Sequence, residues 1–166
     1  MKRIISLFLL IGLAAVATPA LADTKTHDRS RVSFWVPDDW TISGEDRDQF
    51  EVVDPADQVA LLFAVREGKD IKAALAAIDK TIATMATDVK AGPARKVSLN
   101  GMEASVIDAT GKVEGKPVEL SVLIIKTPAK HYLTVLGVLE TQHKKAHEAN
   151  LKKIVASFKP VAKFGK

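Results

Sequence analysis

The sequence contains no cysteine. This absence excludes a disulfide-stapled scaffold, a thiolate zinc site, a cysteine nucleophile and a lipid anchor on an N-terminal cysteine. The Gly-x-Ser-x-Gly turn of hydrolases is also missing, and neither Gly111-Lys112 nor Gly115-Lys116 has the spacing of a phosphate-binding loop. Internal repeats, heptad arrays and low-complexity segments are absent. A chain of 166 residues that is 47% hydrophobic and 27% charged therefore fits one globular domain.

The first 22 residues have the pattern of an export signal. Lys2 and Arg3 precede an uncharged apolar run over 4–16, and Ala20-Leu21-Ala22 supplies the small-x-small motif that a signal peptidase reads. The run is shorter than the roughly 20 apolar residues of a membrane-spanning helix. We therefore expect cleavage between Ala22 and Asp23, a single mature domain over 23–166, and a periplasmic or secreted location without a lipid anchor.

The charge of the chain does not favour nucleic-acid binding. The formal net charge of +4 includes Lys2 and Arg3, so cleavage leaves 4 − 2 = +2 on the mature chain. The charge is unevenly distributed, with acidic residues gathered over 38–57 and lysines gathered after residue 141. The carboxylates over 38–57 lack the EF-hand pattern, and we interpret them as solvated turn residues.

Hydrophobic periodicity predicts the order strands, helix, strands, helix. Strands are expected at 32–36, 40–42, 50–53, 59–65, 96–99, 102–110, 118–127 and 131–139. Apolar residues at helical spacing predict helices over 70–90 and 142–158. Asn100-Gly101 is a strong two-residue hairpin signal. Hairpin-length connections favour an α+β fold of order ββββ-α-ββββ-α, in which helices flank a mainly antiparallel sheet as an α-β-α sandwich. The run over 59–65 is expected to be covered on both faces.

Several short motifs resemble those of the PsbP-like fold family. They are the Val-x-Phe-x-Val-Pro-x-x-Trp opening over 32–40, the acidic Pro turn over 54–57, the Asn100-Gly101 hairpin and the closing Ser157-Phe158-Lys159. Asp39 stands where the family often has glycine. This family includes DcrB-type bacterial envelope proteins. The resemblance implies a binding or accessory protein of the envelope, without a shared active site or cofactor. No small-molecule substrate is indicated.

The last predicted helix carries the surface most suited to a partner. Lys144, Lys145, Lys152 and Lys159 are expected on the side opposite Leu151 and Phe158. One interpretation is a solvated helix with lysines near its C-terminal dipole. The other is weak docking to an acidic envelope protein or to an anionic membrane surface.

A pair of histidines suggests a second class of function. His143 and His147 are four residues apart on the same predicted helix, so both imidazoles could face one metal ion. Lys144 stands where a metalloprotease motif has glutamate, and no third ligand is evident. The alternative to a binding protein is thus a periplasmic hydrolase-like enzyme or a metal-binding protein that uses His143, His147 and, for catalysis, His131 with the acidic turn.

Overall fold

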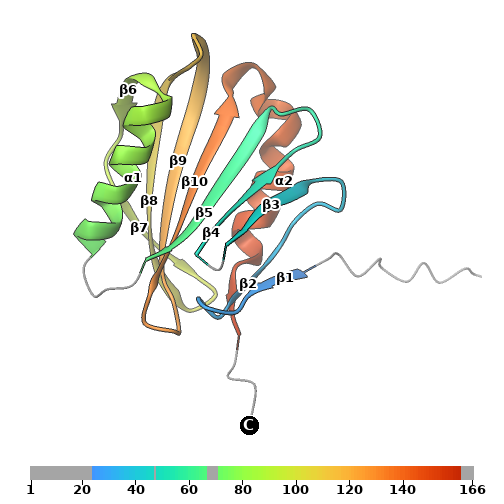
Figure 1. The fold of residues 1–166 in the computed structure, drawn as a ribbon, viewed down its shortest axis with the longest axis vertical. Helices are drawn as coiled ribbons and strands as arrows, with labels where there is room; N and C mark the ends of the chain where they lie inside the picture. Colours follow the sequence, from blue (N-terminus) through green and yellow to red (C-terminus); the bar gives the residue numbers. More distant parts are fainter. Residues whose placement is uncertain (1–23, 47, 67–70, 162–166) are drawn as a thin grey trace, which may run out of the picture.

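The computed structural model describes residues 24–46, 48–66 and 71–161. Within these ranges, eight strands form one large antiparallel sheet of order β3-β4-β5-β10-β9-β8-β6, with β7 also pairing with β8 (Figure 1). These strands are β3 (Thr41–Asp46), β4 (Gln49–Val53), β5 (Val59–Arg66), β6 (Thr87–Ala91), β7 (Arg95–Leu99), β8 (Met102–Val113), β9 (Lys116–Lys126) and β10 (Tyr132–Glu140). The α+β fold with a mainly antiparallel sheet is confirmed.

A small second sheet joins the two ends of the described chain. Its order is β1-β2-β11, from β1 (Thr24–His27), β2 (Val32–Trp35) and β11 (Lys159–Pro160). Lys159 pairs with Ser33, and the Val161 amide donates a hydrogen bond to the Arg31 carbonyl at 2.9 Å. Strands β1 and β11 lie outside the predicted order, because polar or two-residue strands carry no hydrophobic period.

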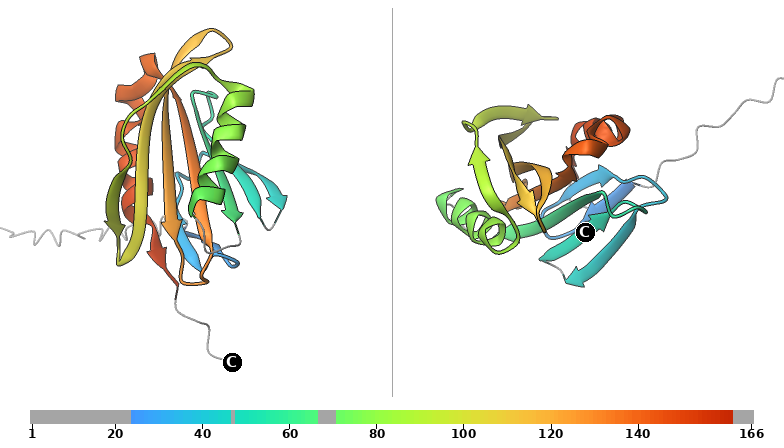
Figure 2. Two further views of the ribbon diagram at one scale, coloured as in Figure 1. Left: turned by 90° about the vertical axis from the view of Figure 1, so that its left-hand side faces the viewer. Right: turned by 90° about the horizontal axis from the view of Figure 1, so that it is seen from above.

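The two helices lie on opposite faces of the large sheet (Figure 2). Helix α1 (Ile71–Met85) packs on β10, whereas α2 (Lys144–Ser157) follows a short 3₁₀ turn, η1 (Thr141–His143), and packs beside β2. No helix in the described ranges is long and apolar enough to cross a membrane.

Each face of the sheet carries its own hydrophobic core. On the α1 face, Ile78 and Ile82 pack with Leu120, Val122 and Leu136. On the α2 face, the core includes four phenylalanines, of which Phe50 and Phe63 stack at 4.4 Å and Phe34 and Phe63 at 4.8 Å. The other ring of this cluster belongs to Phe158, at the end of α2. Strand β9 alternates between the two cores, as a nearly continuous apolar strand should.

Helix α1 is shorter than the sequence predicts. It ends at Met85, and residues 87–91 form β6 at the edge of the sheet instead of continuing the helix to residue 90. Asp88 has a φ of 55°, which a right-handed helix cannot accommodate, and Lys90 pairs with Thr110 of β8. Pairing with β8 therefore satisfies backbone groups that the helix would otherwise have satisfied.

Strand β5 is fully buried on its α2-side face and half-buried on its α1-side face, so the expected cover on both faces is only partly met. Val59, Leu61, Phe63 and Val65 are buried, while the alternate residues are half-buried. Helix α1 lies over β10 and β9, so the α1-side surface of β3, β4 and β5 remains open beside it.

Candidate binding groove

A large groove runs between α2 and strands β8, β9 and β10. Its volume is about 870 Å³. Most of its lining is aliphatic, including Leu61, Leu99, Leu123, Val135, Leu139, Leu151, Ile154 and Val155. Five charged residues also line it, namely Lys90, Asp108, Glu119, Lys144 and Lys152.

Small residues on the sheet beneath α2 leave space for the groove, because they have little or no side chain to fill it. Gly137 of β10 is paired with Leu61 on one side and with Ser121 on the other. A Cβ atom at Gly137 would lie 3.4 Å from Leu61 Cδ2, so a longer side chain would project into the groove. Helix α2 is meanwhile tied to β2, where the Trp35 amide donates to Ser157 Oγ at 2.8 Å. The helix therefore does not settle onto the floor over β8 and β9.

Ion pairs surround the apolar lining. Lys144 Nζ lies 3.0 Å from Glu119 Oε1, and Lys152 Nζ lies 2.6 Å from Glu148 Oε1. The Glu119 carboxylate raises the pKa of Lys144, and Lys152 lowers the pKa of Glu148. Exposed pairs of this kind add little stability, but they neutralise the charge that each lysine presents.

The carboxylate of Asp108 is held at the floor. It accepts a hydrogen bond from Ser121 Oγ at 3.0 Å and pairs with Arg95. Lys90, on the neighbouring strand β6, also lines the groove and has no ion pair within the described ranges.

The four lysines predicted as one partner surface do not share a face. Lys144 and Lys152 line the groove together with Leu151 and Phe158, rather than lying opposite them. Lys145 is exposed, and Lys159 belongs to β11, because α2 ends at Ser157. The predicted placement of the lysines opposite Leu151 and Phe158 is therefore wrong for Lys144 and Lys152, which line the same groove as these two residues, and Lys159 lies beyond the helix, which ends at Ser157.

Another lysine of the same helix was missed. Lys153 Nζ lies 3.6 Å from the centre of the Trp35 ring, an arrangement in which the ring face attracts the cation. No sequence signal links residues this far apart in the chain.

The two predicted metal-binding histidines have separate partners. His147 Nε2 lies 3.0 Å from Gln58 Oε1 and 3.9 Å from Asp54 Oδ2, and its ring meets Trp40 edge-on. His143 is in η1, before α2 begins, and faces Glu140 Oε2 at 3.6 Å. The expectation that both side chains face one ion is thus not met. Among the described residues, no three His, Cys, Asp or Glu side chains gather in a way that would hold a metal.

The structure accounts for His147 as part of the fold. Asp54, which is 3% exposed, accepts hydrogen bonds from the backbone amides of Ala56, Gln58 and Val59 at 2.6–3.0 Å. His147 fixes α2 to this turn through Gln58. His131 lies elsewhere, in the turn before β10, where its amide donates to Thr127 Oγ1 at 3.2 Å. Histidine is absent from the residues that line the groove.

Comparison with known proteins identifies the fold. No family model matches the chain, and no curated protein matches it at a significant level. Solved structures do match: the cyanobacterial PsbP protein CyanoP from Synechocystis superposes with a TM-score of 0.60 at 11% identity, over 89% of this chain and 98% of that protein. The chain therefore has the PsbP-like fold, as its motifs indicated.

Two further structures share this architecture. LpqN, involved in cell envelope biogenesis of Mycobacterium tuberculosis, has a TM-score of 0.54 at 14% identity, over 79% of this chain and 83% of LpqN. A protein of unknown function from Pseudomonas aeruginosa has a TM-score of 0.52 at 15% identity, over 78% of this chain and 92% of that protein. Likenesses at such low identity define the fold and leave function to the site.

Proposed function

We propose that the protein is an exported, non-enzymatic binding or accessory protein of the cell envelope. In this proposal, the groove beneath α2 holds an elongated apolar part of another envelope component. The leader pattern over residues 1–22 and the involvement of LpqN in cell envelope biogenesis support the compartment. The groove supports the mode of action.

The observation that carries the proposal is the apolar lining of a groove of about 870 Å³. Ligand sites occupy about 300–1,000 Å³ and combine mainly apolar walls with a few polar groups. Val155, on the helix wall, is 40% exposed and is therefore an apolar side chain that binding would bury. Catalysis would instead require a nucleophile and a base in mutual contact within the cavity, and the histidines described above have structural partners outside it.

The paired lysines favour apolar contact over attraction to an anionic membrane. Lys144 and Lys152 are each neutralised by a neighbouring glutamate. Membrane attachment by charge alone depends on several unpaired cations. We therefore expect weak or no co-sedimentation with anionic vesicles, even in low salt.

The test is affinity purification from the envelope of the source organism, using the mature protein as bait. Val155→Glu places a charge on the groove wall, and Val89→Glu is its matched control, because Val89 is 38% exposed and lies outside the groove. We expect the same envelope component to co-elute with the wild type and with Val89→Glu, and to be lost with Val155→Glu.

Two results would contradict the proposal. One is equal recovery of all co-eluting components with both variants, which would show that the groove is not used. The other is a reproducible hydrolytic activity that a single substitution of His131, His143 or His147 by alanine abolishes, which would establish the enzyme alternative.

A further inference from the structure

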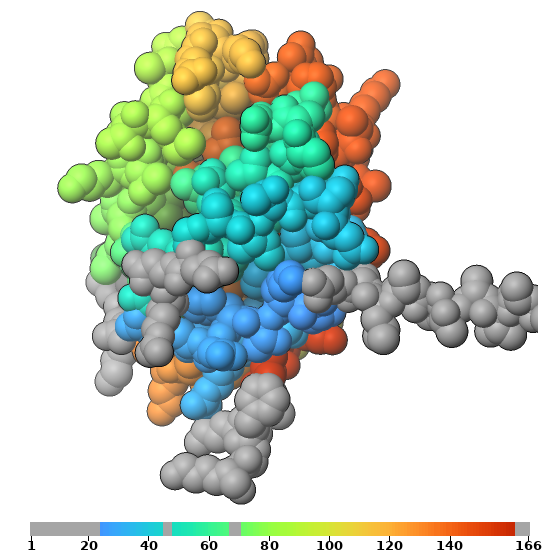
Figure 3. Space-filling view, turned by 45° about the vertical axis from the view of Figure 1, so that its right-hand side comes forward, coloured from blue at the N-terminus to red at the C-terminus, as the bar shows by residue number. Residues whose placement is uncertain are grey.

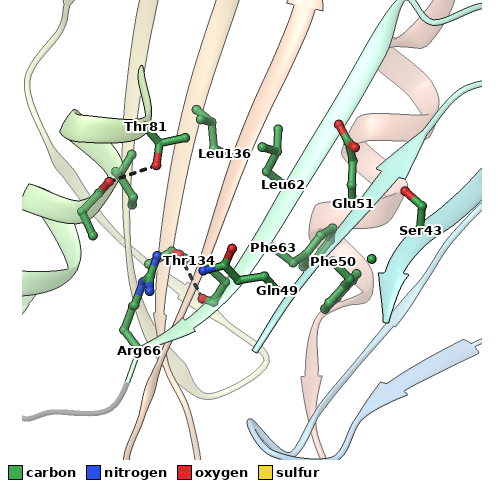
Figure 4. Close-up of a pocket in the computed structure, with 14 residues that line it drawn as sticks. Ser43, Gln49, Phe50, Glu51, Leu62, Phe63, Arg66, Thr81, Thr134 and Leu136 are labelled. Carbon is green, nitrogen blue, oxygen red and sulfur yellow. Dashed lines mark hydrogen bonds between the residues drawn. The ribbon is translucent and has the colours of Figure 1, made fainter. Parts of the chain in front are cut away.

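A second pocket lies on the other face of the sheet, between α1 and the open surface of β3, β4 and β5. It has a volume of about 250 Å³ and is separate from the groove beneath α2 (Figure 4). The surface of β3 to β5 faces the viewer in Figure 3, between α1 and α2. The volume is below the range of about 300–1,000 Å³ for drug-sized ligands, so only a small ligand fits.

The pocket contains two charged side chains of opposite sign that have no partner in the described part of the chain. They are Arg66 and Glu51, both half-buried. The two threonines of the pocket are, by contrast, already engaged: Thr134 Oγ1 donates to the Ala64 carbonyl at 2.9 Å, and Thr81 Oγ1 donates to the Ala77 carbonyl at 3.0 Å. The charged groups still available to a ligand are therefore the guanidinium of Arg66 and the carboxylate of Glu51.

The sheet register separates these two charges. Glu51 is paired with Leu62, and Gln49 with Ala64, whereas Arg66 lies two residues further along β5. Four residues of strand from Leu62 to Arg66 correspond to about 13 Å. In Figure 4, Gln49 lies toward Arg66, while Glu51 and Ser43 lie toward the other side.

Apolar side chains occupy the space between the two ends. Leu62 and Leu136 rise from the sheet, and Ile78 contributes from α1. Ala64 and Ala77 are small and leave room above the floor. The pocket is thus cationic at one end, apolar in the middle and anionic at the other end.

We propose that this pocket binds a short peptide of three or four residues with free termini. Its terminal carboxylate pairs with Arg66 and accepts a hydrogen bond from Gln49, and its terminal ammonium pairs with Glu51. An extended peptide of this length spans about 10–14 Å, which matches the separation of the two charges. Guanidinium groups bind carboxylates with two parallel hydrogen bonds, which makes the cationic end the more selective one.

The experiment is a calorimetric titration of the full mature protein with trialanine, with its C-terminally amidated form and with its N-acetylated form. The variants are Arg66→Gln and Glu51→Gln. Arg95→Gln serves as the matched control, because Arg95 lies in neither pocket. Circular dichroism verifies that each variant is folded.

We expect trialanine to bind the wild type and the control alike, and to bind Arg66→Gln about tenfold or more weakly, as loss of a charged hydrogen-bonded pair implies. Amidation should weaken binding to the wild type by a similar factor, with no further loss in Arg66→Gln. N-acetylation should likewise weaken binding to the wild type, with no further loss in Glu51→Gln. Val155→Glu, in the groove, should leave trialanine binding unchanged.

Three outcomes would overturn the assignment. They are absence of trialanine binding to the wild type, undiminished binding of both the amidated and the acetylated peptide, and unchanged trialanine binding by both Arg66→Gln and Glu51→Gln. Because the groove lies on the other face of the sheet, any of these outcomes leaves the proposed envelope-binding function intact.

Discussion

At the scale of single residues, Asn100 has two roles. Asn100 and Gly101 have φ values of 48° and 85°, so both take the left-handed conformation that a tight hairpin turn requires. The Asn100 side chain also donates hydrogen bonds to the carbonyls of Ala156 at 3.1 Å and Phe158 at 2.7 Å. It thereby satisfies backbone groups at the C-terminal end of α2 that the helix itself leaves unpaired.

Substitution separates these roles. Asn100→Gly retains the turn, because glycine tolerates positive φ, but removes both hydrogen bonds to α2. We expect the free energy of unfolding to fall by about 1–2 kcal/mol, measured by urea denaturation. Glu114→Gly is the matched control, since Glu114 has a φ of 50° in the hairpin before Gly115. It should be neutral or slightly stabilising, and an Asn100→Gly protein as stable as this control would refute the capping role.

The sequence predicted the first of these roles and could not predict the second. Asn-Gly signals a hairpin because the turn depends only on two adjacent residues. The contact with α2 joins Asn100 to Ala156 and Phe158, which lie 56 and 58 positions later in the chain, so no local sequence pattern predicts it. His147 is similar: its spacing suggested a metal ligand, whereas its actual partner is Gln58, 89 positions away.

At the scale of secondary-structure elements, Glu140 joins the start of β9 to the end of β10. Its carboxylate accepts hydrogen bonds from Lys116 Nζ at 2.6 Å and from Gln142 Nε2 at 3.0 Å. The Lys116 hydrogen bond, supported by that of Gln142, lowers the pKa of Glu140 below its ordinary value of 4.5. The folded protein therefore binds this proton less tightly than the unfolded chain does.

This shift implies a defined pH dependence. The stabilisation from Glu140 is present above about pH 4.5 and is lost as the pH falls through the lower pKa of the folded state. Glu140→Gln should lower the urea midpoint at about pH 7. It should match the wild type once the pH is low enough to protonate the Glu140 carboxyl in the folded as well as the unfolded wild-type protein. Asp39→Asn is the control, because Asp39 is exposed and makes no ion pair in the described part of the chain. A midpoint difference that stays constant with pH would argue against the ionic contribution.

The bounds of secondary-structure elements were predictable where apolar residues form a strong pattern, and less so for strands at the edge of the sheet. The apolar runs of β5, β9 and β10 fall where the sequence places them. Residues 87–90 were assigned to a helix because Val89 continues the helical spacing, yet Val89 is 38% exposed on an edge strand. Pairing with β8, which is remote in sequence, outweighs the local preference there.

At the scale of the whole molecule, the site depends on how elements are spaced. The sequence identified α2 and its lysines but not the groove beneath them. That groove exists because Gly137 of β10 is paired with Ser121 on the adjacent strand β9 and because α2 is tied to β2. Both are properties of the assembled sheet, so composition and periodicity do not contain them.

The proposed export leads to a prediction about N-terminal processing. If the leader is cleaved after Ala22, the mature protein begins at Asp23, directly before the first residue of β1. We expect intact mass spectrometry of protein from the native host to show this start, and Ala20→Arg to block processing because the peptidase site requires small residues. Purified protein that begins at Met1 would contradict the prediction.

The pairing of β2 with β11 also has a consequence for the order in which the domain can be completed. A chain that emerges N-terminus first, from a ribosome or a translocation channel, presents Val32 and Phe34 long before Phe158 arrives to cover them. Closure of this core is therefore delayed until almost the last described residue is free. Contacts between such distant positions make folding slow to nucleate. The core over β2 thus cannot be completed before α2 and β11 have emerged.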